Sequence, residues 1–481
     1  MKIINNSKNT VYVEDIDLTI PYQDGKPETI DADTLKKSRC LRNLLVTGFL
    51  DIAEHNENER IEASIVYMKK KQNSSPEKKD EKEILPEKIE TTKEPVEIEK
   101  CSDEIEVRLH GIFYDASGYG KVNRHLAMGL DQAGIKVKVD AKRTKNQLNE
   151  EELKPIVKLA NTQISKRHIT IDSVIPSFAE ISTGAYKVLY STIESYSVPK
   201  QFADSCEMYD EIWLTSPWSK SVLEKHTNKP IYVVPTGADP KLYCEDGPMF
   251  DYSPTINRFV FVSVFGWNYR KGYDVLLKAY FDEFDANDDV SLLIVSRYQS
   301  GQNKHNRMKI KNDIDEIMQQ FPNKDLPHVV RYSKITPEKD MPKIYRAADC
   351  FVLPTRGEGG GLPPLEASLC GLPVIMTNAS GQQMYLREDN SYMLPMDRLE
   401  EIQTGQMKIH YWDGQLFPSL KSKETHNNLR RLMREVVNNY PEAKKRNKRL
   451  QNLIMNEFTW NNTTNAAVKR LKEIHKKLRG K

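Results

Sequence analysis

The organisation of this chain can be worked out from one segment, Arg356-Gly357-Glu358-Gly359-Gly360-Gly361-Leu362-Pro363-Pro364-Leu365-Glu366-Ala367-Ser368-Leu369-Cys370-Gly371. Three successive glycines have no Cβ, so their backbone can approach a ligand closely and can adopt positive φ angles. The two prolines suit the first turn of a helix, which we expect over 365–370 with Gly371 as its C-terminal cap. An apolar strand at 349–354 precedes the glycines. Strand, glycine loop and helix N-terminus together predict a site for an anion or for the hydroxyl groups of a polyol ligand.

Two carboxylates, Glu358 and Glu366, lie in this segment with seven residues between them. An ionised glutamate only accepts hydrogen bonds, so two of them facing one cavity suit a ligand with pairs of hydroxyl donors. The simpler interpretation is that Glu366 offsets the helix dipole and that Glu358 is a solvated loop residue. The intervening Gly-Gly-Gly-Leu-Pro-Pro-Leu sequence favours the binding site over that interpretation.

The spacing from Glu358 to Glu366 resembles the Glu-x7-Glu motif of the retaining family 4 glycosyltransferases, which have the GT-B fold, and the residues that follow, 366–375, are similar to that family's usual continuation. The resemblance covers about residues 107–477. It implies that Glu366 binds the ribose diol of a nucleotide and that Glu358 binds hydroxyls of the donor sugar. It also implies that backbone amides meet the sugar hydroxyls and the diphosphate; these belong to Gly359, Gly360, Gly361 and Leu362.

The composition describes a globular chain of 481 residues with 29% charged residues and a net charge of only +3. This balance gives no reason to expect nucleic-acid binding. Six cysteines without a Cys-x-x-Cys pair suggest neither a zinc site nor a disulfide framework, so a reducing cytoplasm is the expected location. The N-terminus lacks the apolar core of a signal peptide, and no apolar run is long enough to cross a bilayer, which leaves peripheral membrane contact open.

The sequence predicts an α/β protein of the GT-B type, in which two Rossmann-like domains face a cleft, preceded by a small α/β module on a disordered linker. The module contains two stretches of strand-like alternation between Val11 and Ile20, and a helical pattern from Asp33 to Gly48. A core of this size is only marginally stable by itself, so we expect the module to self-associate or to dock onto a partner. The expected parts are a small N-terminal module of unknown role at 1–66, a charged flexible linker at 67–103, an N-terminal acceptor domain at 104–238, a C-terminal nucleotide-sugar donor domain at 239–455, and a helix crossing back to the N-terminal domain at 456–481.

The first Rossmann-like domain contributes a second glycine loop, Ser117-Gly118-Tyr119-Gly120, between a strand and a helix at 121–133. It resembles the family 4 loop that approaches the donor diphosphate and the acceptor, which assigns Gly118 and Gly120 to the donor and Tyr119 to the acceptor. Glu194 lies at the carboxyl end of an expected strand at 187–194, where ligands collect in α/β sheets, so it is a candidate acceptor contact and equally a structural carboxylate. His110 and His168 lack metal-ligand spacing and are interpreted as ordinary loop or surface residues.

The donor domain is expected to begin with a buried strand at 258–265, followed by a loop that carries Arg270 and Lys271 just before a helix. Two cations at a helix N-terminus are well suited to a diphosphate. The family usually places an arginine several residues before the Lys-Gly pair, but in this sequence Trp267 stands there. The resemblance also implies backbone contacts to the nucleobase near Ile335.

The resemblance implies transfer of a hexosyl group from a nucleotide-sugar with retention at the anomeric carbon, a step of carbohydrate biosynthesis. We assign Glu358, Arg270 and Lys271 as catalytic residues, with no general base and no cofactor. No metal is expected either, because no Asp-x-Asp occurs in a suitable loop. Donor base, sugar and acceptor stay open, and the acceptor alternatives are a glycan, a lipid-linked sugar and a protein side chain. Rival interpretations are a GT-B epimerase or phosphorylase, and a nucleotide-sugar-binding scaffold protein without turnover. A glycosidase is disfavoured because the two glutamates flank an anion-binding loop.

Overall fold

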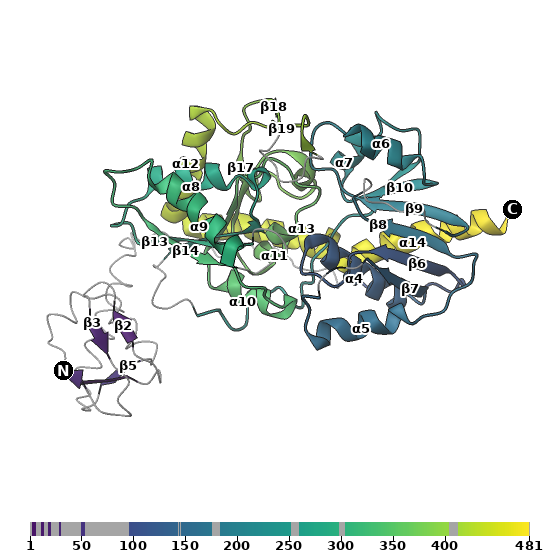
Figure 1. Ribbon diagram of the computed structural model, residues 1–481, viewed down its shortest axis with the longest axis horizontal. Helices are drawn as coiled ribbons and strands as arrows, with labels where there is room; N and C mark the ends of the chain where they lie inside the picture. The colour runs from purple at the N-terminus through teal and green to yellow at the C-terminus, as the bar shows by residue number, and fades with distance from the viewer. Residues whose placement is uncertain are drawn as a thin grey trace, which may run out of the picture. The chain divides into compact units, whose positions relative to one another are not determined.

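A computed structural model describes the greater part of the chain: five short strands before residue 53, and residues 96–142, 144, 146–175, 183–251, 259–297, 304–403 and 412–480, of which 304–306 by backbone alone. The chain divides into two compact units (Figure 1). Residues 1–91 and 251–256 form the first unit, and residues 92–250 and 257–481 form the second.

The first unit contains β-strands in antiparallel pairs. β1 (Lys2–Asn5) pairs with β4 (Glu28–Thr29) and with β5 (Leu50–Ile52), while β2 (Val11–Val13) pairs with β3 (Leu18–Ile20). The alternation between Val11 and Ile20 therefore does mark two strands. The helix expected from Asp33 to Gly48 and the linker as far as residue 95 lie outside the described residues.

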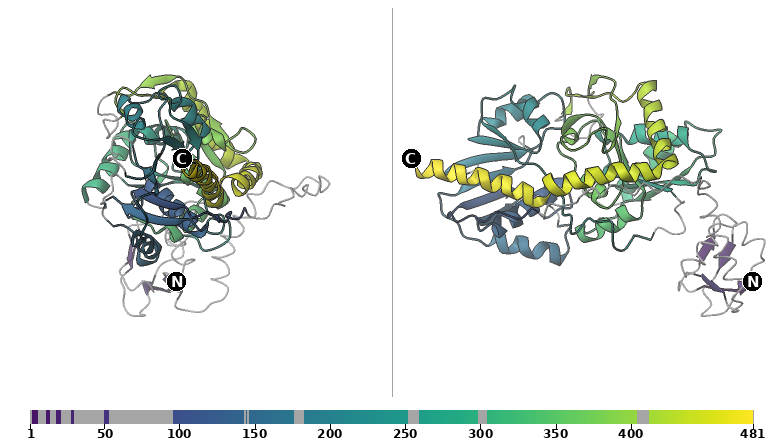
Figure 2. Two further views of the ribbon diagram at one scale, coloured as in Figure 1. Left: turned by 90° about the vertical axis from the view of Figure 1, so that its right-hand side faces the viewer. Right: turned by 180° about the vertical axis from the view of Figure 1, so that it is seen from behind.

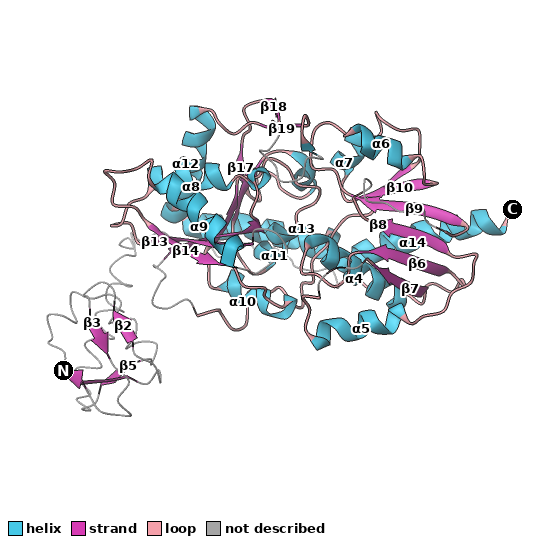
Figure 3. Ribbon diagram, viewed as in Figure 1, coloured by secondary structure: helices cyan, strands magenta, loops and turns pink. Residues whose placement is uncertain are grey.

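The second unit begins with a six-stranded parallel sheet in the order β11-β10-β9-β8-β6-β7 (Figure 3). Its strands are β6 (Glu106–Gly111), β7 (Lys136–Ala141), β8 (Ile169–Ser173), β9 (Tyr186–Ser191), β10 (Glu211–Leu214) and β11 (Ile231–Val233). Its helices are α4 (Gly118–Gln132), α5 (Glu150–Ala160), α6 (Lys200–Cys206) and α7 (Pro217–Leu223). Strands alternate with helices, as the sequence predicts for a Rossmann-like domain.

A second six-stranded parallel sheet follows, in the order β14-β13-β12-β15-β16-β17. Its strands are β12 (Phe259–Gly266), β13 (Val290–Arg297), β14 (His328–Tyr332), β15 (Cys350–Leu353), β16 (Val374–Thr377) and β17 (Tyr392–Leu394), and a hairpin of β18 (Leu399–Glu401) and β19 (Leu416–Pro418) lies beyond them. The interior of β12 is almost wholly apolar, which is typical of a parallel strand with helices on both faces.

The helices of this second domain and of the C-terminal region complete the unit. They are η3 (Tyr269–Lys271), α8 (Tyr273–Glu283), α9 (Lys304–Met318), η4 (Glu338–Asp340), α10 (Met341–Arg346), α11 (Leu362–Leu369), η5 (Ser380–Met384), α12 (Lys423–Asn438), α13 (Tyr440–Glu457) and α14 (Trp460–Arg479). α11 begins at Leu362 and not at residue 365, because both prolines fit its first turn, where no backbone N–H is needed. Gly371 follows the helix with φ 91°, as expected for a C-terminal cap.

The last helix returns to the first Rossmann-like domain. The right view of Figure 2 shows α13 and α14 (yellow) crossing in front of both Rossmann-like domains, and α14 packs against α4. The two crossings between the domains pair with each other: Ala238 N donates to Phe458 O at 2.9 Å, and Trp460 N donates to Ala238 O at 3.2 Å. A Cβ on Gly237 would overlap the backbone of Thr459, so only glycine allows this close approach.

Residues 96–103 correct the expected linker boundary. Asn461 Nδ2 donates to Val96 O at 2.7 Å, and Asn465 Nδ2 donates to Glu97 O at 2.8 Å. Cys101 N donates to the carbonyl of Ala133, just after α4, at 2.7 Å. These residues therefore belong to the folded second unit, because their backbone groups are hydrogen bonded to α14 and to the residue that follows α4.

The two histidines also differ from the expectation of surface residues. His110 is buried on β6, with Nδ1 3.1 Å from Asp172 Oδ1, and Tyr209 donates its hydroxyl to Asp172 Oδ2 at 3.0 Å. His168 is also buried, with Nδ1 2.6 Å from the carbonyl of Ser165. A parallel strand covered on both faces leaves the His110 side chain no route to water, so it is buried with a hydrogen-bond partner. His168 lies just before β8, and its Nε2 has no hydrogen-bond partner among the described residues.

Candidate functional site

The glycine loop after β15 and the basic loop after β12 lie side by side, because these two strands are neighbours in the second sheet. Arg356 N donates to Arg270 O at 2.6 Å. The Arg356 side chain is fully buried, donates to both carboxylate oxygens of Asp274 at 2.9 Å, and stacks 3.7 Å over the Tyr269 ring. A bidentate, stacked guanidinium holds its partners in one geometry. Arg356 therefore fixes the two loops together, a role that the sequence analysis missed.

Lys271 and Glu358 form a buried ion pair at this junction. Lys271 Nζ lies 2.6 and 2.7 Å from the two carboxylate oxygens of Glu358, and Thr355 Oγ1 donates to Oε1 at 2.9 Å. Burial alone would raise the pKa of Glu358, but Lys271 and Arg270 outweigh it and the pKa is lowered. The pKa of Lys271 is also lowered, because burial and the Arg270 charge outweigh the two nearby carboxylates. Glu358 is thus held ionised at neutral pH.

Arg270 extends the charge network across to the first domain. Its Nη2 lies 2.9 Å from Glu194 Oε1, and its Nη1 donates to Gly357 O and lies 3.6 Å from Glu358 Oε1. Burial raises the pKa of Glu194, opposed by Arg270 and Lys271. The four charged groups therefore alternate in sign, in the order Glu194, Arg270, Glu358 and Lys271. An entering diphosphate would compete with these carboxylates for the same two cations.

Glu366 is paired with a lysine of the other domain. Lys121 Nζ, on α4, lies 2.5 Å from Glu366 Oε1 and 3.0 Å from Glu338 Oε1, and Tyr345 donates its hydroxyl to Glu366 Oε2 at 2.8 Å. Burial would lower the pKa of Lys121, but the two carboxylates outweigh it and the pKa is raised. His125 Nε2 lies 2.9 Å from the same oxygen of Glu338, Oε1. We call Lys121, His125, Glu338, Tyr345 and Glu366 the Lys121 cluster.

The glycines of the loop are needed for contact with the first domain. A Cβ on Gly359 would overlap Thr192 Oγ1, and one on Gly357 would overlap the carbonyl oxygen of Glu194. A Cβ on Gly360 would lie 2.7 Å from Thr236 Oγ1. The loop therefore fits closely against the carboxyl-end loops of the first sheet. Gly361 has φ 80°, which favours glycine for a second reason.

Ser380 holds the backbone of Glu358 from the other side. It is the single non-glycine residue with positive φ in the described part of the chain, at 60°, and is fully buried. Glu358 N donates to Ser380 Oγ at 3.0 Å, and Gly381 N donates to Glu358 O at 2.8 Å. A strained conformation of this kind costs about 1–3 kcal/mol and persists where the surroundings fix it. Nothing in the local sequence pattern singles out Ser380 for this role.

The remaining sequence-predicted residues are placed as follows. Trp267, which stands where the family has an arginine, is buried, stacks 4.2 Å from the Tyr273 ring and donates Nε1 to Asp313 Oδ2 at 2.8 Å. It fills the core under the basic loop and offers a phosphate no charge. Gly118 is exposed at the start of α4, Gly120 is buried, and Tyr119 between them is half-buried, with its pKa raised by burial and then by Glu194. Ile335 is half-buried in the loop after β14.

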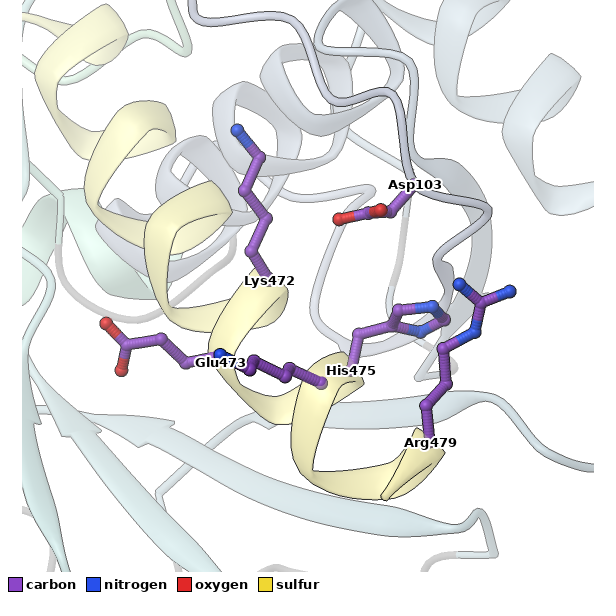
Figure 4. Close-up of a pocket in the computed structure, with 6 residues that line it drawn as sticks. Asp103, Lys472, Glu473, His475 and Arg479 are labelled. Carbon is purple, nitrogen blue, oxygen red and sulfur yellow. The ribbon is translucent and has the colours of Figure 1, made fainter. Parts of the chain in front are cut away.

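Two cavities lie away from the glycine loop. One of about 390 Å³ lies at the end of α14 and is lined by residues that include Asp103, His475 and Arg479 (Figure 4). Another of about 360 Å³ is lined by residues that include Tyr392 and Arg446. Neither is lined by a glycine-loop residue. We place the candidate site at the loop for its chemistry: fixed cations, carboxylates and the start of α11 at the carboxyl ends of two sheets.

Comparison with known proteins points to glycosyltransferases. Residues 256–405 match the family model described as glycosyl transferases group 1. O-antigen chain mannosyltransferase B of Escherichia coli is 47% identical over 51 residues, which are 11% of this chain and 13% of that protein. A GDP-mannose-dependent monoacylated alpha-(1-6)-phosphatidylinositol monomannoside mannosyltransferase of Corynebacterium glutamicum is 32% identical over 119 residues, 23% of this chain and 27% of that protein. The matched segments cover less than a third of these relatives' length.

A solved structure is similar over most of the chain. The sucrose-phosphate synthase of Thermosynechococcus elongatus aligns with a TM-score of 0.54 and 16% identity, covering 78% of this chain and all of that one. This likeness shows the fold, and with the two sheets described above it confirms the expected GT-B architecture. Within the described ranges, no helix is both long enough and apolar enough to span a membrane.

Proposed function

We propose that this chain, a glycosyltransferase of the GT-B type, transfers a hexosyl group from a nucleotide-sugar to a saccharide, lipid-linked or protein acceptor with retention of anomeric configuration. One observation carries the proposal: Arg270, Lys271 and Glu358 converge within hydrogen-bond or ion-pair distance at the carboxyl ends of β12 and β15. A diphosphate needs fixed cations, and a sugar needs an ionised acceptor for its hydroxyls.

The donor diphosphate is assigned to Arg270 and Lys271. On donor binding, Arg270 exchanges its contact with Glu194 for a phosphate oxygen, and Lys271 shifts from Glu358 toward the diphosphate. The backbone amides at the N-terminus of α11, at Gly359, Gly360, Gly361 and Leu362, add the positive end of the helix dipole. Gly118 and Gly120 of the first domain approach the same phosphates.

The rest of the donor is assigned to residues on either side of the diphosphate. Glu358, released from Lys271, accepts hydrogen bonds from the sugar hydroxyls, and Glu366 accepts from the ribose diol. The backbone at Ile335 meets the nucleobase. Tyr119 and Glu194 of the first domain face the acceptor. In this assignment residues 104–238 bind the acceptor, residues 239–455 bind the donor, and the C-terminal helix joins the two.

The proposed reaction breaks the bond between the anomeric carbon and the leaving phosphate oxygen and forms a bond from that carbon to the acceptor oxygen. Arg270 and Lys271 stabilise the negative charge that develops on the departing diphosphate, which is electrostatic catalysis. The leaving phosphate oxygen takes the acceptor's proton on the same face of the sugar. No protein nucleophile, general base or metal is needed.

The names of the relatives guide the choice of donor. Two are mannosyltransferases, and one is named as GDP-mannose-dependent, so GDP-mannose is the first donor to test. Family 4 membership rests on the Glu358 to Glu366 motif.

The test follows nucleoside diphosphate release with GDP-mannose and UDP-sugars, in the presence of candidate saccharide acceptors. Turnover is expected, with the anomeric configuration of the product equal to that of the donor by NMR. Donor binding without any release would instead support the scaffold alternative, phosphate-dependent release would support a phosphorylase, and an inverted product would contradict retention.

A further inference from the structure

Arg297 stands at the carboxyl end of β13, next to the basic loop but outside the site assigned above. Its backbone pairs with Gly266 at the end of β12, and its carbonyl accepts from Trp267 N at 2.8 Å. The side chain therefore starts at the edge of the sheet where ligands collect in α/β folds. In the strand order it lies on the side of β12 opposite to β15 and the glycine loop.

The Arg297 guanidinium reaches the first domain. Nη2 donates to the carbonyl of Ala116, in the loop before α4, at 3.1 Å. Nη1 is enclosed and has no hydrogen-bond partner among the described residues. Burial lowers the pKa of Arg297, and the charge of Asp115 opposes this only in part. The Nη1 group of Arg297 is therefore shielded from solvent and donates no hydrogen bond to any described residue.

Two other arginines near the cleft, Arg270 and Arg124, have no such unpaired nitrogen, whereas Arg356 has one at Nε but already binds Asp274 through both of its other nitrogens. Arg270 binds Glu194 and Gly357 O, and Arg124, also buried, donates Nη1 to the carbonyls of Phe113 and Asp115 at 2.8 Å. Leaving a buried donor unsatisfied costs about 1–3 kcal/mol, and more for a charged group. A ligand that supplies an anionic oxygen would remove this cost.

We propose that Arg297 binds a phosphoryl group of the acceptor, so that the enzyme prefers acceptors carrying a phosphate. This inference rests on the proposed function and names the acceptor's chemistry. A guanidinium presents paired N–H groups that match the oxygens of a phosphate. The single carbonyl of Ala116 accepts from only one nitrogen of Arg297. We assign the phosphoryl group to the acceptor because the donor diphosphate already has two cations, Arg270 and Lys271, which contact the β15 side of the β12 loop, whereas Arg297 lies on the β13 side.

The first arm of the test asks whether the phosphoryl group belongs to the donor. GDP and UDP are titrated by calorimetry into the wild type, Arg297→Ala and Arg270→Ala. Arg297→Ala is expected to change the dissociation constant by less than about 2-fold, whereas Arg270→Ala weakens binding by about 10-fold or more, equivalent to about 1.4 kcal/mol. An equal loss in both variants would place Arg297 at the donor diphosphate and overturn the proposal.

The second arm measures acceptor chemistry with the wild-type enzyme saturated by the nucleoside diphosphate that binds. Glucose, mannose and myo-inositol are compared with glucose 6-phosphate, mannose 6-phosphate and myo-inositol 3-phosphate as probes. At least one phosphorylated probe is expected to bind about 10-fold more tightly than its parent, a preference that Arg297→Ala abolishes. Arg297→Lys should keep part of it. The matched control is Arg331→Ala, an exposed arginine on neighbouring β14.

Each outcome decides the matter. No preference for any phosphorylated probe, or a preference that Arg297→Ala leaves intact, overturns the inference while the proposed function stands. If no nucleoside diphosphate binds the wild type, the proposed function fails, and this inference fails with it. Thermal unfolding of each variant shows whether it is folded, and Arg297→Lys supplies the comparison if Arg297→Ala is not.

Discussion

Lys121 of the first Rossmann-like domain and Glu366 of the second form an ion pair with 2.5 Å between Nζ and Oε1, although 245 positions separate them in the sequence. Both side chains are largely buried, at 12% and 6% exposure. The carboxylate that the proposed function assigns to the ribose diol is therefore held by a lysine of the facing domain. Donor binding must either extend this contact or replace it.

Replacing Lys121 by Met should destabilise the protein strongly. It removes the cation shared by Glu366 and Glu338, and breaking a buried ion pair costs about 3–5 kcal/mol because the remaining charge is uncompensated. Chemical denaturation measures the change. Lys136→Met is the control, since Lys136 is 55% exposed in its pair with Glu106 and such pairs contribute about 0–1 kcal/mol. Equal losses in the two variants would show that the Lys121 contact is not a buried pair.

Replacing Lys271 by Ala should lower kcat/KM for sugar transfer by about 10²–10³-fold, the usual effect of removing one group that stabilises developing negative charge. Glu358→Gln, which keeps the shape of the side chain but loses its charge, should also reduce transfer. Lys200→Ala, at an 86% exposed lysine on α6, should leave kcat/KM unchanged. Transfer that survives both Lys271→Ala and Glu358→Gln would rule out this assignment of catalytic residues.

Adding one methyl group at Gly359 should separate the two domains at the glycine loop. The new Cβ overlaps Thr192 Oγ1, so Gly359→Ala can fold only if the loop or the facing strand end moves. Overpacking of this kind costs about 1–3 kcal/mol, and we expect donor affinity to fall by about 10-fold or more. Gly480→Ala, where the nearest atom is 3.6 Å away, is the control for an alanine placed without overlap. Unchanged stability and donor affinity in Gly359→Ala would show that the loop does not pack as described.

The stability of the protein should fall with acidification because of Glu338. Burial would raise its pKa, but Lys121 and His125 outweigh burial, so the pKa is held well below the ordinary value of 4.5. A carboxyl with a depressed folded-state pKa contributes stability above its unfolded pKa and loses it as pH falls through the folded pKa. Unfolding free energies from pH 6 to pH 3 should therefore decline less steeply in Glu338→Gln than in the wild type. Parallel curves would contradict the paired state of Glu338.

Much of the fold follows from local sequence pattern. The alternation of apolar strands with helices predicts both parallel sheets, since each element is set by residues within a few positions of one another. The glycine, proline and basic residues after β12 and β15 likewise predict that Arg270, Lys271 and Glu358 lie at strand ends, and the structure brings them together. The predicted start of α11, residue 365, is three residues after the observed start at Leu362, because the two prolines belong to the first turn of the helix.

The contacts across the cleft could not be predicted in this way. Lys121 was recognised only as a helix start, and nothing local indicates that it meets Glu366 from the other domain. Ser380 gives no sign of its positive φ, because serine rarely adopts that conformation without a tertiary cause. His110 was misjudged since a lone histidine in a strand does not show that Asp172 stands on the adjacent strand.

A crystal structure of the protein soaked with GDP-mannose or a UDP-sugar tests the central claim most directly. We predict diphosphate oxygens within hydrogen-bond distance of Arg270 and Lys271, sugar hydroxyls on Glu358, and the ribose diol on Glu366, with the Lys121 contact shifted to admit it. A nucleotide-sugar bound away from the β12 and β15 loops, or none bound while the Arg270–Glu194 and Lys121–Glu366 pairs stay intact at saturating donor, would contradict the account.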